Sequence, residues 1–234
     1  MSDVSVIAVD GPSGTGKGTV CGLLAECLRW HLLDSGALYR LVALLAERSG
    51  TSTSDEDALA ALAADMELDF VRGSNEAPIR ALLAGEDVTG AIRTESVSRL
   101  ASEVAACPAV RETLLARQRA CRQAPGLIAD GRDMGTVVFP DAELKLFLTA
   151  SAEERARRRY KQLKDKGIGV NLRQLSADIA ERDARDSQRP ISPLKPAPDA
   201  VVIDTTDVAI EDVMQCVMAL VQERLTALPA STSL

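Results

Sequence analysis

The first chemically suggestive stretch of the chain is a run of glycines that carries one lysine and ends in a threonine. It reads GPSGTGKGT and contains the spacing G-x-x-x-x-G-K, which is typical of loops that bind nucleoside triphosphates. Glycines let backbone N–H groups crowd around an anion, a lysine can reach the outer phosphates, and a hydroxyl can bind magnesium. The residues predicted to hold the phosphates are Gly11, Pro12, Ser13, Gly14, Thr15, Gly16, Lys17, Gly18 and Thr19.

One position of this loop departs from the motif. The residue after Lys17 is Gly18 rather than serine or threonine, so we expect the metal-side hydroxyl from Thr19. The alternative is a glycine-rich turn that caps a helix and binds no ligand. We favour the phosphate loop because an apolar strand pattern precedes it and a helical pattern follows it, as the motif requires.

A second polar segment follows the apolar run Leu127 to Ala129. An acid at the carboxyl end of a buried strand, in a chain with a phosphate loop, can hold magnesium through water, and Asp130 has that position. Arg132 could bind a phosphate, and Asp133 could accept hydrogen bonds from the amino group of a base. Without the phosphate loop, an ordinary charged turn would explain these residues equally well.

A third segment, LLDSGALYR, places a short polar turn before a helical pattern. The N–H groups at a helix start favour an anion, and Arg40, one turn into the helix, could add a two-pronged phosphate contact. The simpler alternative is that Asp34 or Ser35 is an N-cap and nothing more.

A cluster of basic residues occupies the second half of the chain. Its members are Arg155, Arg157, Arg158, Arg159, Lys161, Lys164, Lys166, Arg182, Arg185 and Arg189. Phosphoryl transfer spreads negative charge over the transferred group, so arginines that close over the site are expected. The alternative is a solvated face with ion pairs spaced i, i+4: Glu153 with Arg157, Glu154 with Arg158, Glu181 with Arg185, and Arg182 with Asp186. Given the phosphate loop, we favour a lid.

Composition excludes several other chemistries. His31 is the only histidine, so paired-histidine zinc sites cannot form, and any serine or cysteine nucleophile with a histidine base would depend on it. The 27 basic and 34 acidic residues give a net charge of −7. This balance argues against a protein that binds nucleic acid or an anionic membrane through a broad basic surface.

The chain also has the features of a cytoplasmic protein. Its five cysteines are scattered without a C-x-x-C pair, which fits a reducing compartment. The N-terminus lacks the pattern of a secretory signal, and no apolar run approaches the ~18 residues of a membrane span. With no heptad seam or apolar surface stripe, we expect a monomer.

Strand and helix patterns alternate at both ends of the chain. The expected strands are Val4–Val9, Trp30–Asp34, Leu127–Ala129, Leu144–Leu148 and Val201–Ile203. The expected helices are Lys17–Leu28, Ala37–Arg48, Asp55–Met66 with Ser54 as its cap, Glu95–Ala106, Ala109–Gln123, Ala152–Lys166, Leu172–Gln188 and Ile210–Leu225. This order predicts a three-layer α/β fold around a parallel five-stranded sheet, with ligands at the carboxyl ends of the strands.

The middle of the chain differs in character. Residues Glu67 to Thr89 alternate like strands and contain a predicted turn at Gly85-Glu86, which indicates an inserted antiparallel hairpin. Pro108 is expected to separate the two helices that follow. The tail from Pro229 is expected to be frayed.

Taken together, GPSGTGKGT, HLLDSGALYR, GEDVTGAIRTESV, IADGRDMGTVVFPDAELKLFL and ERDARDSQRP resemble the bacterial cytidylate kinase family. The likeness runs from about Val4 to about Leu225. It implies a P-loop kinase core at 1–34 and 125–234 with a short lid at about 153–170. It also implies a monophosphate-binding region at 35–124, which includes an α+β insert at about 67–106.

The resemblance also implies a reaction, in which MgATP and CMP or dCMP give ADP and CDP or dCDP by in-line attack. The implied catalytic residues are Lys17, Arg132, Arg158, Arg182 and Arg189, the last of which would assist closure. Arg40, Arg132 and Arg182 would bind the CMP phosphate. The implied base readers are Ser102, Arg111 and Asp133, with Ser35 and Asp186 completing the nucleoside site. Thr19 and Asp130 are the expected magnesium residues, Asp130 through water. An acid, a serine and an arginine complement the edge of cytosine.

Two further functions stay open. A kinase of this fold could use another acceptor, such as UMP, AMP or shikimate, and a panel of acceptors separates these. A regulatory nucleotide switch would hydrolyse ATP or GTP slowly without any acceptor. A nucleic-acid module built on the arginine-rich helix conflicts with the net charge and with the lack of stacking aromatic residues there.

Overall fold

The computed structural model of the chain describes residues 4–74, 77–165, 167 and 169–226. The chain forms two compact units. Unit 1 comprises Met1–Leu33, Arg122–Ser187 and Ser192–Leu234, and unit 2 comprises Asp34–Cys121 and Gln188–Ile191. The predictions for Lys166 and for the tail from Pro229 lie outside the described residues.

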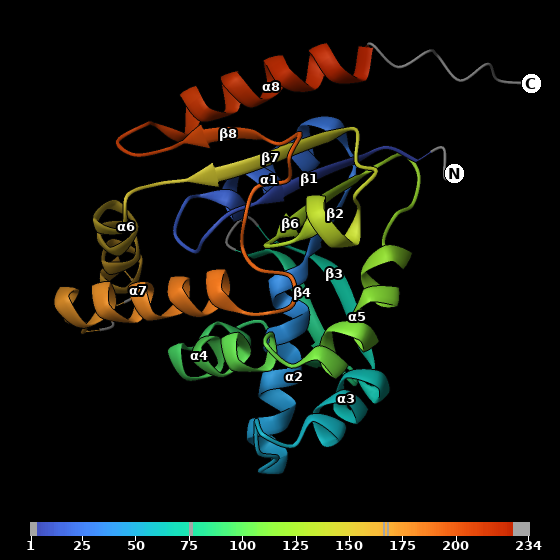
Figure 1. Ribbon diagram of the computed structural model, residues 1–234, viewed down its shortest axis with the longest axis vertical. Helices are drawn as coiled ribbons and strands as arrows, with labels where there is room; N and C mark the ends of the chain where they lie inside the picture. The colour runs from blue at the N-terminus through green and yellow to red at the C-terminus, as the bar shows by residue number, and fades with distance from the viewer. Residues whose placement is uncertain (1–3, 75–76, 166, 168, 227–234) are drawn as a thin grey trace, which may run out of the picture. The chain divides into compact units, whose positions relative to one another are not determined.

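Unit 1 is built on a five-stranded parallel sheet in the order β2-β6-β1-β7-β8 (Figure 1). The strands are β1 (Val6–Asp10), β2 (His31–Asp34), β6 (Leu127–Gly131), β7 (Leu144–Thr149) and β8 (Val201–Asp204). β1 runs parallel to both β6 and β7, and β7 runs parallel to β8. All of β1 is buried, as expected for a short aliphatic strand inside a parallel sheet. The predicted α/β fold is confirmed.

Helices α1 (Lys17–Leu28) and α8 (Ile210–Thr226) pack on the sheet through one apolar core. That core joins Ile7 and Val9 of β1 to Leu24 of α1 and Val217 of α8. Unit 1 also contains α6 (Ala152–Asp165) and α7 (Leu172–Gln188), which follow β7 in the chain. Among the described residues, no helix is long and apolar enough to cross a membrane.

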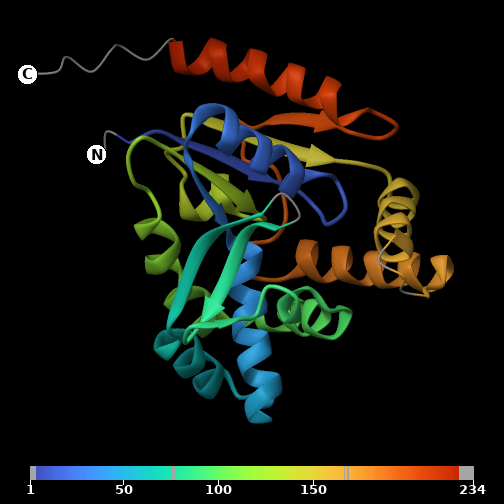
Figure 2. The same ribbon diagram turned by 180° about the vertical axis from the view of Figure 1, so that it is seen from behind.

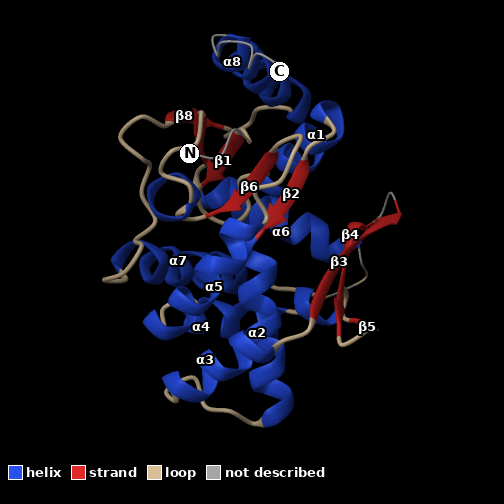
Figure 3. Cartoon of the chain, turned by 90° about the vertical axis from the view of Figure 1, so that its right-hand side faces the viewer, coloured by secondary structure: helices blue, strands red, loops and turns tan. Residues whose placement is uncertain are grey.

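Unit 2 combines helices with a small antiparallel sheet (Figure 2). Its helices are α2 (Ser35–Ser49), α3 (Glu56–Asp65), the 3-10 turn η1 (Ala91–Arg93), α4 (Glu95–Val104) and α5 (Pro108–Ala120). Its strands are β3 (Leu68–Ser74), β4 (Ala77–Leu83) and β5 (Glu86–Asp87), which pair in that order (Figure 3). Helix α2 packs on α4, and α3 packs on α5.

Two predictions about helix starts are wrong. Asp55, not Ser54, caps α3, because its carboxylate accepts a hydrogen bond from the Ala58 N–H at 3.1 Å, three residues ahead as an N-cap requires. Pro108 does not stand between the two helices but is the first residue of α5. A proline fits there because the first N–H of a helix has no partner within the helix.

The predicted turn of the small sheet is displaced by one residue. The two turn residues are Ala84 and Gly85, with φ of 47° and 81°, and Glu86 already belongs to β5. A two-residue turn whose twist matches its strands needs positive φ at both positions, and glycine at the second lowers the strain. The one-turn π-helix η2 (Met134–Val138) after β6 was not predicted either.

Candidate functional site

The glycine-rich loop connects the end of β1 to the start of α1, as predicted (Figure 1). Gly11, Gly14 and Gly16 have φ of 142°, 81° and 89°, values that other residues adopt only with strain. Gly16 is the N-cap of α1, and no described side chain caps that helix start. The first N–H groups of α1 can therefore face an anion.

Gly11 is required by space as well as by conformation. A Cβ atom at this position would lie 2.0 Å from the backbone oxygen of Leu148 in β7. We expect Gly11→Ala to lower the free energy of unfolding by about 2 kcal/mol or more, because backbone must move to remove the clash. Chemical denaturation measures this. Gly22→Ala is the matched control. Apart from the adjoining backbone of α1, no atom of the described residues lies within 4 Å of its Cβ position, so the same change inside α1 should stabilise the protein by about 0.5 kcal/mol or more.

Lys17 is buried, and its ammonium donates a hydrogen bond to the Pro12 carbonyl at 2.8 Å. Burial and then the positive charge of Arg132 lower the pKa of Lys17 from 10.5 to about 8, against an opposing effect of Asp130. The structure thus brings Lys17, Arg132 and Asp130 into one electrostatic environment. A bound polyphosphate would stabilise the protonated form of Lys17, because opposite charges attract strongly where water is excluded.

This pKa predicts proton uptake when a nucleotide binds. About half of the Lys17 side chains are neutral at pH 8 in the free protein, so binding of a magnesium-bound ATP analogue should take up about 0.5 proton there and almost none at pH 6.5. Affinity should fall about fivefold between pH 8 and pH 9. Calorimetry in two buffers of different ionisation enthalpy measures the uptake. Lys17→Arg, which stays protonated, should show none; equal uptake in both proteins would contradict the assignment.

Three of the predicted acceptor-binding residues meet within unit 1. The Arg132 Nε donates to the Asp186 carboxylate at 3.2 Å, and the Arg182 Nε lies 3.9 Å from the same oxygen. Asp186 is buried, so its charge holds two guanidinium groups in place from α7. Two fixed arginines side by side form a suitable site for a phosphate dianion.

Asp10, the last residue of β1, is a functional candidate that the sequence analysis missed. Its carboxylate accepts hydrogen bonds from the N–H groups of Met134 and Gly135, both at 2.8 Å. Burial raises the pKa of Asp10 to about 6, and the charge of Asp133 adds to the effect. Asp10 therefore anchors η2 directly after Asp133. Its position immediately before the glycine-rich loop is the feature of the sequence that could have identified Asp10.

Unit 2 carries a further set of predicted acceptor-binding residues, beginning at α2. Asp34 is the N-cap of α2, and its carboxylate accepts hydrogen bonds from the Ala37 N–H at 3.0 Å and from Arg40 at 2.8 Å. A Cβ at Gly36 would lie 3.0 Å from the Arg40 guanidinium, so glycine allows this close pairing. Ser35 is the buried first residue of α2. The N-cap alternative thus holds for Asp34, with Arg40 as its ion-pair partner.

The remaining base-reader candidates of unit 2 lie on α4 and α5. Ser102 is buried on α4, and its hydroxyl has no hydrogen-bond partner among the described residues. Arg111 is buried on α5, donates to the Ala105 carbonyl at 3.0 Å, and lies 5.4 Å from the centre of the Tyr39 ring. A buried hydroxyl without a partner is costly in a folded protein, so it suggests that a ligand completes the bond.

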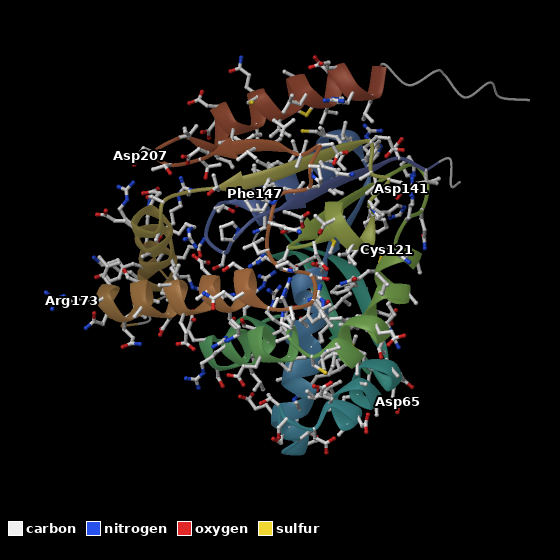
Figure 4. All side chains as sticks on the ribbon, in the orientation of Figure 1. Asp65, Cys121, Asp141, Phe147, Arg173 and Asp207 are labelled. Carbon is white, nitrogen blue, oxygen red and sulfur yellow. The ribbon has the colours of Figure 1, made fainter. Side chains whose placement is uncertain are left out.

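The basic residues of α6 do not behave as one group. Arg158 donates to Glu154 at 2.7 Å and to the Thr205 carbonyl at 2.6 Å. Arg157 pairs with Glu154 rather than with Glu153 and also contacts Asp207 in the loop after β8, labelled in Figure 4. The predicted pairs Glu154–Arg158, Glu181–Arg185 and Arg182–Asp186 are present.

Arg155 departs furthest from the prediction of a mobile lid arginine. Its side chain is 5 % exposed and makes a two-pronged ion pair with Asp183 on α7, at 2.6 and 3.1 Å. An arginine held this firmly positions other groups and does not swing over a substrate. Arg189 follows α7 and is buried, but its segment Gln188–Ile191 belongs to unit 2 rather than to the core region 125–234 expected from the sequence.

Thr205, which follows β8, was also missed. Its hydroxyl lies 3.0 Å from the carbonyl oxygens of Thr15 in the glycine-rich loop and Thr149 at the end of β7. The rule that functional residues follow the strands of a parallel sheet would have singled it out. Thr205 thus links the loop to Arg158.

The residues proposed for magnesium supply oxygen ligands only. Thr19 is exposed at the start of α1, and a Cβ at Gly18 would lie 3.7 Å from the Asp130 carboxylate. No group of three or more His, Cys, Asp or Glu side chains that could hold a metal ion occurs within the described ranges. Magnesium in nucleotide sites is usually held by substrate phosphates and water together with one or two protein oxygens.

Comparison with known proteins decides the family. The family model described as cytidylate kinase matches residues 7–223. The chain belongs to the cytidylate kinase family. The cytidylate kinase of Azotobacter vinelandii is 58 % identical over 94 % of this chain and 96 % of its own length. That of Pseudomonas paraeruginosa is 60 % identical over 92 % of this chain and 94 % of its own.

The solved structures add evidence on the fold alone. An uncharacterized protein from Eubacterium ventriosum is 11 % identical and covers 94 % of this chain and 99 % of its own, with a TM-score of 0.51. The parallel sheet, the glycine-rich loop after β1 and membership of the cytidylate kinase family agree with the P-loop kinase fold expected above. The predicted family and fold are therefore confirmed.

Proposed function

We propose that this protein transfers the γ-phosphoryl group of MgATP to CMP or dCMP, giving ADP and CDP or dCDP. The observation that carries this proposal is the buried Lys17 of the glycine-rich loop in the same electrostatic environment as Arg132, which Asp186 holds in place. The Lys17 ammonium suits the donor phosphates, and the Arg132 guanidinium suits an acceptor phosphate. Family membership supports cytidine nucleotides as the acceptors.

On the donor side, Gly11 to Thr19 hold the ATP phosphates through backbone N–H groups, and the Lys17 ammonium binds the transferred group. Arg158, held by Glu154 and Thr205, adds positive charge from α6. When bound, magnesium neutralises charge on the outer phosphates. Thr19 and Asp130 are the residues proposed to hold it, Asp130 through a water molecule.

On the acceptor side, Arg132 and Arg182 bind the CMP phosphate together with Arg40. Ser102, Arg111 and Asp133 read the cytosine edge, and Ser35 and Asp186 complete the nucleoside site. Cytosine presents an amino donor beside two acceptors, so a carboxylate, a hydroxyl and a guanidinium complement it. The buried Ser102 hydroxyl, which has no hydrogen-bond partner in the described part of the chain, supports this assignment.

The reaction needs no protein nucleophile. A phosphate oxygen of CMP forms a bond to the γ-phosphorus as the bond to the β-phosphate oxygen breaks, and ADP leaves with that electron pair. The protein positions the two nucleotides and neutralises charge, with Lys17, Arg132, Arg182 and Arg189 proposed for this role. We propose that the region at about 153–170, beyond the first turn of α6 that Arg155 holds to Asp183, closes over the nucleotides. Water that reached the γ-phosphate would otherwise hydrolyse ATP.

A panel of acceptors tests the function. ADP release is measured with MgATP and each of CMP, dCMP, UMP, AMP and shikimate, with one reaction lacking an acceptor. Turnover confined mainly to CMP and dCMP is the expected result. Faster turnover with another acceptor would overturn the base assignment, and slow hydrolysis that no acceptor accelerates would favour a nucleotide switch.

We further propose a monomeric cytoplasmic enzyme that acts on small nucleotides and binds neither nucleic acid nor membranes. The net charge of −7 and the scattered free cysteines support this proposal. Light scattering measures the mass in solution.

A further inference from the structure

Arg155, in the first turn of α6, is packed against the tip of the glycine-rich loop. A Cβ atom at Gly14 would lie 3.0 Å from the Arg155 Cβ, so the two segments are in direct contact. The Arg155 Nη1 donates to the Ser13 carbonyl at 3.3 Å, and its Nε donates to the Ala150 carbonyl at 3.1 Å. Arg155 therefore binds the glycine-rich loop through a backbone carbonyl. It does not occupy the backbone N–H groups of the loop that would bind phosphate.

The same guanidinium also holds α7. Its Nη1 donates to one oxygen of Asp183 at 3.1 Å, and its Nη2 donates to the other at 2.6 Å. Nη1 is thus shared between the Ser13 carbonyl and Asp183. Because a guanidinium is planar and rigid, a shift of the loop backbone must either move Asp183 or break one of these bonds.

Asp183 stands between the two residues of α7 that are proposed to bind the acceptor. Arg182 precedes it directly, and Asp186 follows one helical turn later and binds Arg132 at 3.2 Å. A displacement of Asp183 would therefore move Arg182 and Asp186. The chain of contacts from Ser13 through Arg155 and Asp183 to Asp186 lies entirely within unit 1.

We propose that the Arg155–Asp183 ion pair couples the two substrate sites, so that binding of one nucleotide raises the affinity for the other. Arg155 and Asp183 are positioning residues in this account, and they touch neither substrate. The inference rests on the proposed function, because it needs ATP at the loop and CMP at α7. Coupling of this kind is reciprocal: each nucleotide must change the affinity for the other by the same factor.

The test is a pair of binding measurements by calorimetry. The Kd of AMP-PNP with magnesium is measured with and without saturating CMP, and the ratio is the coupling factor. We expect about fivefold or more in the unmodified protein, within the usual range for coupled sites. Asp183→Asn keeps the shape of the side chain but removes the charge and one acceptor, and should bring the factor close to one.

Glu181→Gln is the matched control. Glu181 pairs with Arg185 on the exposed side of the same helix, so its loss should leave the coupling factor unchanged. If Asp183→Asn does not fold, Arg155→Lys is measured instead, because lysine keeps the charge and loses the two-pronged geometry. A reduced factor in either variant, with the control unchanged, supports the proposal.

Two results would overturn the coupling proposal: a factor of one in the unmodified protein, or an unchanged factor in the variant. Turnover in the acceptor panel separates this failure from failure of the proposed function. If CMP is phosphorylated efficiently but the variant keeps the full factor, the function stands and the coupling role of the ion pair is wrong. If CMP is neither bound nor phosphorylated, the proposed function itself falls.

Discussion

Replacing Lys17 by methionine is expected to lower kcat/KM for MgATP about 10³-fold or more while the protein remains folded. Lys17 is the only residue of the glycine-rich loop that carries a positive charge, and its ammonium would bind the transferred group where charge develops. Methionine fills nearly the same volume. Because burial lowers the pKa of Lys17, removing the buried charge should leave the free energy of unfolding unchanged or raise it. Steady-state kinetics and thermal unfolding measure the two effects.

Lys195→Met is the control for this experiment. Lys195 is an exposed residue between α7 and β8, so the same change there should alter neither activity nor stability appreciably. Near-normal activity of Lys17→Met would rule out the proposed mechanism. Loss of activity together with unfolding would show that Lys17 has a structural role that the burial argument does not predict.

The second large effect concerns selectivity. Asp133→Ala should lower the ratio of kcat/KM for CMP to that for UMP about 10- to 100-fold, because a hydrogen bond from the cytosine amino group to a carboxylate contributes about 1.5–3 kcal/mol. The KM for ATP should change far less. Asp133 is buried directly before η2, which Asp10 holds in place. The substitution therefore removes a single carboxylate at the carboxyl end of the sheet and leaves the anchored backbone in place.

Asp141→Asn provides the comparison for Asp133→Ala. Asp141 lies in the same connection between β6 and β7 but is exposed and paired with Arg122 (Figure 4). Its replacement should leave the CMP to UMP ratio intact. Equal losses toward both acceptors in Asp133→Ala, or an equal loss of ATP binding, would remove Asp133 from the set of base readers.

Local patterns were sufficient for the elements that carry the donor loop. The predicted helix Lys17–Leu28 matches α1 residue for residue, and each predicted strand of the large sheet is present within two residues at either end. The strands of the large sheet are short and rich in aliphatic residues, so propensity and burial favour the same structure. The errors at Ser54 and Gly85-Glu86 are shifts of one residue, where neighbouring residues compete for the same cap or turn.

Partner choice among charged residues was not predictable. Arg155, Arg157 and Arg158 are close together in the sequence, and nothing in the sequence distinguishes their partners. In the structure Arg155 joins the glycine-rich loop to α7, whereas Arg157 and Arg158 share Glu154. Helical spacing ranks the possible local pairs but carries no information on a carboxylate nearly thirty positions away. Asp183 reaches Arg155 only because the fold packs α7 beside α6 (Figure 1).

The amino-acid order was enough to predict the family, the glycine-rich loop between β1 and α1 and the types of residue available for the two proposed nucleotide sites. These properties depend on side-chain chemistry and on contacts within a few residues. The burial that lowers the pKa of Lys17, the anchoring of η2 by Asp10 and the sharing of Arg155 between Ser13 and Asp183 emerged only from the folded chain. Each depends on desolvation or on contacts between segments far apart in the chain, and these arise only when the parallel sheet brings the ends of its strands together.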